Sequence, residues 1–221
     1  MQQMKREVII LATAKLADDW ILVGIARSSD ISEEWIRLRK AGGKISESDL
    51  KFKSGERIQP LDIVSMEIAK SGSGHDYTWD TSAPTELLTR LEAESRTSIL
   101  HEFAKESIRR VNLKSEPFAL IGPIYPTAIF SKSGTTSKAM LIAPELGDDQ
   151  YIQVDDPKWL ALGESILRRS NEMVLDSDFL ERTLGVHKLY TVVGADGDDD
   201  FSVLCVHTIP DYSTELYFPI M

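Results

Sequence analysis

The 221-residue sequence has few of the features that mark disulfide-rich, zinc-binding or membrane-spanning proteins. Its single cysteine, Cys205, excludes an internal disulfide and a cysteine-based zinc cluster. No apolar run approaches the roughly 18 residues of a membrane span, and the run over 8–14 is followed at once by a lysine. We interpret that run as a strand and not as a secretory signal. The expected protein is therefore cytoplasmic, with no membrane partner.

Positive charge is also scarce. The chain has 25 Lys and Arg against 35 Asp and Glu, and its net charge of −10 argues against a protein that coats nucleic acid non-specifically. The shortage of positive charge relative to negative charge is confined to one half of the chain. Residues 1–115 hold 18 basic and 18 acidic side chains, whereas residues 116–221 hold 7 and 17. This difference in character predicts two domains.

Strand-like segments dominate both halves. Short apolar or alternating runs predict strands in the first half over 8–12, 20–26, 34–39 and 61–68. In the second half they predict strands over 118–121, 127–130, 139–142, 151–154, 189–193, 201–207 and 216–220. Mixed spacings of three and four predict one or two helices between Pro84 and Arg110. Asp155 or Asp156, followed by Pro157, predicts a helix that runs to about Arg169.

This order lacks the alternating strand–helix rhythm of a parallel sheet. We predict a mainly β fold (β-rich α+β) with two small β-barrels joined by a helical connector. The predicted domains are a first barrel over 1–75, the connector over 76–115, and a second barrel with one internal helix over 116–221.

Several segments resemble the dual OB-fold-containing domain family of prokaryotes. They are EVIILAT over 7–13, the Gly24-Ile25 pair, EEWIR over 33–37, LDIV over 61–64 and DPKW over 156–159. The match covers residues 6–68 moderately well and the rest thinly. The chain departs from the family in its first turn, over 17–21, and at Leu38, where members have proline.

The resemblance implies two OB-like β-barrels, in a family found with anti-phage and other conflict systems. It also implies nucleic-acid binding, a role inferred for that family mainly from its fold. Effector proteins are the implied protein partners.

The best candidate binding surface is the basic stretch 35–57, which has seven cations against three carboxylates. Single-strand binders combine a basic groove with aromatic side chains on which bases stack. Arg37 and Arg39 share one face of the predicted strand, opposite Ile36 and Leu38. The candidate nucleic-acid-binding residues are Trp35, Arg37, Arg39, Lys40, Lys44, Lys51, Phe52 and Lys53. The alternative is a solvated β-hairpin with Trp35 packed in the core.

The remaining motifs are better explained by structural roles than by binding or catalytic roles. Residues 132–138 resemble a phosphate loop but lack its first glycine, so we predict a hairpin turn there. The Asp-rich run 196–200 fits a solvated loop, with a hard-cation site or an acidic docking patch as alternatives. Cys205 lies among apolar residues, as an inert buried thiol does. A general base in the His75-Asp76 loop stays open, but no nucleophile motif accompanies it. We predict no metal, no cofactor and no catalytic residue.

The sequence thus predicts a non-catalytic nucleic-acid-binding or sensing module. It leaves open DNA or RNA, strandedness and oligomeric state. The alternative is a protein-interaction adaptor whose acidic C-terminal half docks a basic partner. A clustered positive face favours the first function, whereas dispersed positive charge with a large acidic or apolar patch favours the second.

Overall fold

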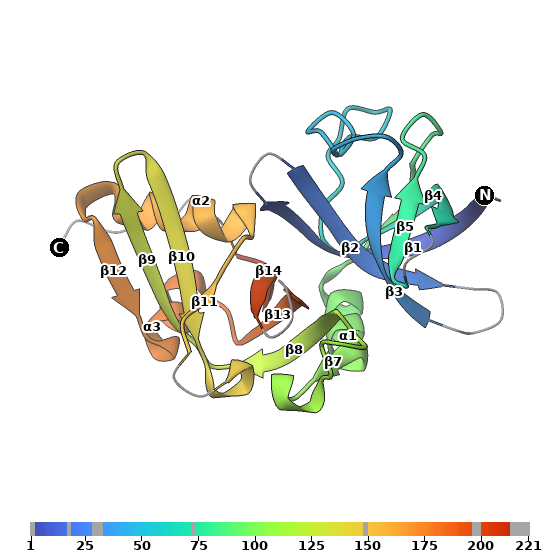
Figure 1. Cartoon of the computed structure of the whole chain (residues 1–221). Helices are drawn as coiled ribbons and strands as arrows, with labels where there is room; N and C mark the ends of the chain where they lie inside the picture. Colours follow the sequence, from blue (N-terminus) through green and yellow to red (C-terminus); the bar gives the residue numbers. More distant parts are fainter. Residues whose placement is uncertain are drawn as a thin grey trace. The chain divides into compact units, whose positions relative to one another are not determined.

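The computed structural model describes residues 3–16, 19–27, 33–71, 74–147, 150–195 and 200–212 (Figure 1). Strands make up 50% of the structure and helices 19%, which confirms the predicted mainly β fold. The chain divides into two compact units, residues 1–96 and 97–221. Within the described residues, no helix is long and apolar enough to cross a membrane.

The first unit is a closed five-stranded β-barrel with one additional strand. Its strands are β1 (Met4–Leu16), β2 (Asp19–Arg27), β3 (Glu33–Lys40), β4 (Asp62–Lys70), β5 (Asp76–Trp79) and β6 (Glu86–Arg90). They are hydrogen-bonded in the order β1-β2-β3-β5-β4-β6, and β1 closes the barrel by also pairing with β4. All neighbours are antiparallel except β3 and β5, which are parallel.

The barrel core follows from the alternation of side chains along each strand. Val8 and Ile10 of β1 and Ile36 and Leu38 of β3 are at most 1% exposed and belong to one apolar cluster. The other members are Trp20, Leu22, Ala26, Ile45, Leu50, Phe52, Ile58, Val64, Met66, Ile68, Tyr77 and Trp79. Gly24 of β2 allows a close approach of β1, because a Cβ there would lie 2.4 Å from the carbonyl oxygen of Ile9.

The segment 76–115, predicted as a helical connector, holds more strand than expected. Its first part contributes β5 and β6 to the first sheet, and helix α1 covers only Ala93–Phe103. A short 3₁₀ helix follows at Ile108–Arg110. The apolar spacing after Pro84 suits a helix, but β6 instead pairs with β4, and its Leu87 packs against the barrel core.

The second unit contains two four-stranded sheets among its described residues. Their strands are β7 (Ala104–Lys105), β8 (Phe118–Ile124), β9 (Thr127–Ser133), β10 (Thr136–Ile142), β11 (Ile152–Gln153), β12 (Glu172–Leu175), β13 (Lys188–Ala195) and β14 (Phe201–Ile209). One sheet has the order β11-β10-β9-β12 and the other β14-β13-β8-β7. A parallel bridge between Val154 and Val203 links them.

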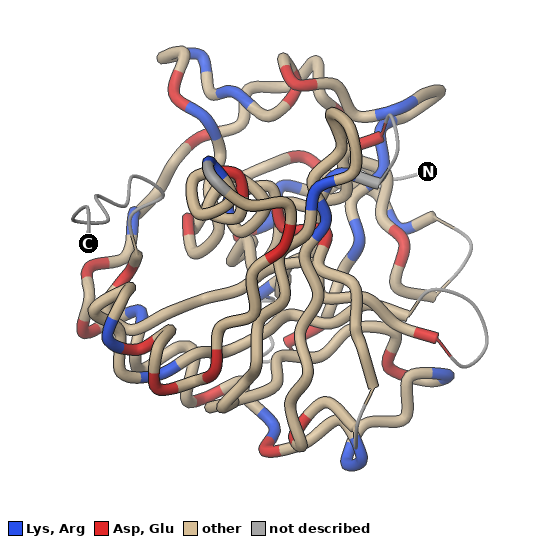
Figure 2. Tube along the Cα trace, turned by 90° about the vertical axis from the view of Figure 1, so that its left-hand side faces the viewer, with Lys and Arg blue, Asp and Glu red and all other residues tan. Residues whose placement is uncertain are grey.

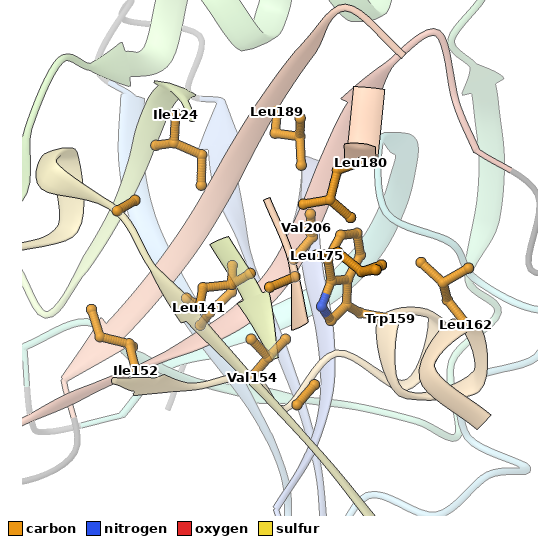
Figure 3. Packing of buried hydrophobic residues seen from close by; sticks show 14 of the residues in the cluster. Ile124, Leu141, Ile152, Val154, Trp159, Leu162, Leu175, Leu180, Leu189 and Val206 are labelled. Carbon is orange, nitrogen blue, oxygen red and sulfur yellow. The ribbon is translucent and has the colours of Figure 1, made fainter. Parts of the chain in front are cut away.

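Helix α2 (Pro157–Ile166) confirms the predicted internal helix of the second half. Asp156 is its N-cap, with Oδ1 accepting the backbone N–H groups of Lys158 and Trp159. Trp159 is fully buried, among Leu162, Leu175, Leu180 and Val206 (Figure 3). A 3₁₀ helix, Leu167–Arg169, continues α2 to the predicted end.

Other sequence predictions for the second half have mixed outcomes. The phosphate-loop-like stretch is a β9–β10 hairpin in which Ser133 pairs with Thr136, so the predicted turn is confirmed. Strand β12 and helix α3 (Ser177–Leu184) were not predicted. A 3₁₀ turn also covers Pro144–Leu146. Most of the Asp-rich run and the predicted strand 216–220 lie outside the described residues.

Candidate functional site on the first barrel

Strand β3 presents the basic residues that the sequence singled out. Because Ile36 and Leu38 point into the barrel core, Trp35, Arg37 and Arg39 lie on the opposite face, as predicted. Trp35 is half-buried and does not belong to the core cluster, so the alternative of a core aromatic does not hold for it. The face therefore carries two guanidinium groups and one partly exposed indole.

The two arginines converge on one carboxylate. Arg37 donates to Asp76 from Nε at 2.7 Å and from an Nη at 3.2 Å, and Nε of Arg39 lies 3.0 Å from the same carboxylate. The parallel pairing of β3 with β5 places Asp76 directly beside Arg37. Burial would raise the pKa of Asp76, but the hydrogen bonds and positive charges of Arg37 and Arg39 outweigh it and lower that pKa. Asp76 is therefore ionised at neutral pH and fixes the orientation of both guanidinium groups.

Lys40 is held by a similar arrangement. Its Nζ lies 2.9 and 3.0 Å from the two carboxylate oxygens of Asp49. Asp49 also accepts hydrogen bonds from the backbone N–H and the hydroxyl of Ser46, which anchors it to the turn after β3. Burial would raise the pKa of Asp49, but these bonds from Ser46 and Lys40 lower it. The ammonium group at the end of β3 is thus positioned by an ionised carboxylate.

A hollow of about 220 Å³ lies beside these cations. It is formed because the chain after β3 folds back onto the start of β2: Trp20 N–H donates to the Ile45 carbonyl, and Ile45 N–H donates to Asp19 Oδ1. Its lining consists of Asp19, Trp20, Ile21, Arg37, Leu38, Arg39, Lys40, Gly43 and Ile45. We call this feature the β2–β3 hollow.

The structure brings together only part of the predicted site. Arg37, Arg39 and Lys40 line the β2–β3 hollow, and Lys44 is exposed between two of its lining residues. Lys51 and Lys53 are exposed on a separate turn. The backbone of Lys51 forms an isolated antiparallel β-bridge with that of Arg57.

Phe52 requires a correction. The sequence predicted it as a stacking aromatic, but it is 7% exposed and belongs to the barrel core. Its turn is closed by hydrogen bonds between the backbones of Phe52, Gly55 and Glu56, and this turn directs the ring inward. An aromatic between two exposed lysines looks the same in the sequence whether it is displayed or buried.

Sequence reasoning missed the contribution of β2 to the site. Trp20 lines the hollow, and the guanidinium of Arg57 lies 4.4 Å from the centroid of its ring. Arg57 is also paired with Glu47 at 3.0 Å. Trp20 stood in an apolar run that indicated a buried strand, and it is 8% exposed; only the tertiary contact with the turn after β3 places it in the lining of the hollow.

The His75-Asp76 loop has a structural arrangement. Asp76 serves the two arginines, and His75 Nδ1 lies 3.2 Å from the Trp35 carbonyl oxygen. Nearby, the Tyr77 hydroxyl donates a short hydrogen bond to Glu34, which Lys70 also contacts at 3.2 Å. Burial, and then the bond to Glu34, raises the pKa of Tyr77 to about 12. These contacts tie β3, β4 and β5 together at one end of the barrel.

Outside the hollow, basic and acidic segments lie next to one another along the chain. Figure 2 shows Lys and Arg segments next to Asp and Glu segments along the trace. Among the described residues, no group of three or more His, Cys, Asp or Glu side chains is arranged to hold a metal ion. Burial, and then the negative charge of Asp156, raises the pKa of Cys205 well above its ordinary value, so this thiol is protonated at neutral pH.

Comparison with known proteins adds no assignment: no protein-family model matches the chain, and no curated protein is significantly similar to it. The candidate site therefore rests on its own geometry.

Proposed function

We propose that the protein is a non-catalytic nucleic-acid-binding or sensing module whose contact surface is the outer face of β3 and the β2–β3 hollow. The observation that carries the proposal is the convergence of Arg37, Arg39 and Lys40 on one concave surface, each held in place by an ionised carboxylate. Guanidinium and ammonium groups that are already oriented lose little entropy when they bind phosphate oxygens. Half-buried Trp35 lies on the same strand face and offers an aromatic surface to a base.

The strand order of the first barrel supports an OB-like assignment. The OB-fold is a five-stranded Greek-key barrel whose β2–β3 face and two loops bind oligonucleotides. The first unit has five strands in a closed order, and its candidate site lies on β2 and β3.

We extend the proposal to the whole chain as follows. The second unit is a second OB-like barrel, since the Val154–Val203 bridge joins its two sheets, and α1 belongs to the helical connector between the barrels. The chain is then a cytoplasmic member of the dual OB-fold-containing domain family and acts with effector proteins in prokaryotic defence. Three of the resembling segments support this family assignment. EVIILAT lies in β1 and EEWIR lies in β3, while LDIV consists of Leu61 and the first three residues of β4.

The test is fluorescence anisotropy with labelled single-stranded DNA, single-stranded RNA and duplex DNA at two salt concentrations. Joint replacement of Arg37, Arg39 and Lys40 by Ala removes three phosphate contacts. We expect the slope of log K against log salt to become shallower by about 2 for a single strand. Trp35→Ala should weaken binding with little change in the salt slope. Wild-type protein that binds none of the three probes at low salt would contradict the proposed function.

Two controls separate local contacts from net charge and from folding. Joint replacement of exposed Lys132, Lys138 and Arg168 by Ala removes the same charge from the second unit and should leave the slope unchanged. The triple site variant leaves Asp76 and Asp49 without their cations, so circular dichroism must show that it folds. If it does not fold, Arg39→Ala with Lys44→Ala replaces it, because Arg37 still pairs with Asp76.

The protein-interaction adaptor is the second candidate function. Four large apolar side chains of the second unit are 40–65% exposed: Tyr125, Tyr151, Val174 and Phe179. Scattered apolar residues are common on surfaces, so this observation is weaker than the cationic hollow. Failure of all three nucleic-acid probes would favour the adaptor.

A further inference from the structure

The β2–β3 hollow has a cationic lining whose balancing carboxylates are set back. Its charged lining residues are Arg37, Arg39, Lys40 and Asp19. The carboxylates that pair with the three cations, Asp76 and Asp49, do not belong to the lining. An anion in the hollow would therefore meet the cations directly and the two carboxylates only at longer range.

The cations also keep donor groups for a ligand. Among the described residues, Arg39 contacts Asp76 through Nε, and Lys40 uses two of its three N–H bonds on Asp49. Arg39 has a side chain that is 56% exposed, whereas the figure for Arg37 is 31%. Arg39 is thus the cation with the most donors available, and Arg37 is the one most firmly fixed.

The size of the hollow limits what it accepts. Its volume of about 220 Å³ is below the roughly 300–1,000 Å³ of pockets that enclose a drug-sized ligand. Gly43 and Ile45 belong to its lining, where the turn after β3 folds back onto β2. A hollow of this size holds one phosphate with part of its sugar. A strand that ends there fits more easily than one that must enter and leave.

Charge distinguishes the two kinds of phosphate that nucleic acid offers. An internal phosphodiester carries one negative charge, whereas a terminal monoester carries about −1.5 to −2 at pH 7, because its second pKa is about 6. The lining itself holds three cations and one carboxylate, and Asp76 and Asp49, which lie outside the lining, offset part of this positive charge. The lining therefore matches a monoester better than a diester.

We propose that the β2–β3 hollow binds the terminal phosphate monoester of a nucleic-acid strand, so that the first barrel recognises phosphorylated ends. This inference rests on the proposed nucleic-acid function and specifies its ligand. The phosphate lies against Arg39, Arg37 and Lys40, while the adjoining nucleotide lies along the β3 face toward Trp35. Internal phosphates then contribute only general, salt-sensitive affinity.

The experiment compares oligonucleotides that differ only at their ends. Short labelled strands with a 5′-phosphate, a 3′-phosphate or hydroxyl groups at both ends are titrated with wild-type protein at pH 7.5. We expect one phosphorylated end to bind roughly tenfold more tightly than the hydroxyl-ended strand, as one strong charge-assisted hydrogen bond would give. The phosphorylated strand that binds more tightly identifies which end is recognised. At pH 5.5 the ratio should fall, because the monoester takes up a proton near pH 6.

Variants assign the preference to the hollow. Arg39→Ala should bring the ratio to within about twofold, since it removes the most available donors in the lining. Lys53→Ala removes an exposed cation outside the hollow and should weaken all strands while keeping the ratio. If both variants reduce the ratio equally, or if neither does, the assignment to the hollow is overturned.

The outcomes separate this inference from the proposed function. Equal affinity for all three strands overturns end recognition and leaves nucleic-acid binding in place. Absence of binding to every strand overturns the proposed function. Calorimetry with adenosine 5′-monophosphate then tests whether the hollow binds a phosphate monoester. Heat of binding that Arg39→Ala abolishes would support a monoester site, and no heat would overturn it.

Discussion

The carboxylates Asp76 and Asp49 of the first unit and Asp156 of the second have opposite roles. In the first unit, Asp76 and Asp49 pair with cations that line a surface hollow. In the second, Asp156 is 4% exposed and accepts backbone N–H groups from α2 and from Val206 of β14, at 2.8 Å. The first arrangement positions side chains at the surface, whereas the second joins a helix to a strand. The role of a carboxylate is therefore clear only when the groups that donate hydrogen bonds to it are known.

Tryptophan shows the same contrast. Trp159 is fully buried in the second unit, and its ring centroid lies 5.6 Å from those of both Phe130 and Tyr212. Gly163 of α2 completes the packing, because a Cβ there would lie 2.4 Å from the Phe130 ring. Trp35 of the first unit is only half-buried. The first unit also packs Trp20 and Trp79 in its core, so the contrast lies in Trp35, which it leaves on the candidate binding face.

The largest expected loss of stability comes from a substitution in the core of the second unit. Trp159→Ala should lower the free energy of unfolding by about 3–5 kcal/mol, through lost burial and the cavity left behind. Trp35→Ala should cost less, about 1–2 kcal/mol, because this side chain is only partly buried and lies outside the core cluster. Urea unfolding of both variants measures the difference. Equal destabilisation would show that Trp35 is a packing residue and would weaken its proposed role in binding.

The next effect tests whether Asp156 has more than a capping role. Asp156→Ala removes the N-cap of α2 and leaves the buried N–H of Val206 without its acceptor, so we expect a loss of about 2–4 kcal/mol. Asp176→Ala is the matched control, since Asp176 is exposed and caps α3 by accepting from Phe179. That control should cost about 1 kcal/mol in the same urea experiment. Similar losses would mean that the bond to Val206 contributes little.

The smallest effect concerns pH and has opposite signs in the two units. Burial raises the pKa of Asp156 above its ordinary value, despite the opposing N–H donors, so folding favours its protonated form. Its contribution to stability is full below the unfolded pKa and is lost as pH rises through the folded pKa. The pKa values of Asp76 and Asp49 are lowered, so their contributions are present above the unfolded pKa and are lost as pH falls through the folded values.

Hydrogen exchange measured between pH 7 and pH 4, and corrected for intrinsic rates, tests this difference. Amides near Asp156 should gain protection at the lower pH relative to those around Asp76. Asp156→Asn should abolish the gain, because the amide does not titrate. A gain of equal size in the variant would assign the pH response to other groups.

The sequence predicted some elements well because their determinants are local. The cap at Asp156 and the proline after it set the start of α2, and the glycine of 132–138 set a two-residue hairpin turn. Alternation along 34–39 correctly placed Arg37 and Arg39 opposite the core. Strand β6 was not predicted, because the β4 residues with which it pairs lie 21–28 positions earlier in the sequence and its apolar spacing also fits a helix.

By itself, the sequence determined the mainly β composition, the outward face of β3 and the start of α2, since each depends on periodicity or on neighbours a few residues apart. Tertiary structure decided which residues form the site. It buried Phe52, brought Trp20 and Asp19 of β2 beside the cations, and supplied Asp76 from β5 as their shared partner. The physical reason is that ladder register and chain reversal set distances between strands, and these contacts have no local signature in the sequence.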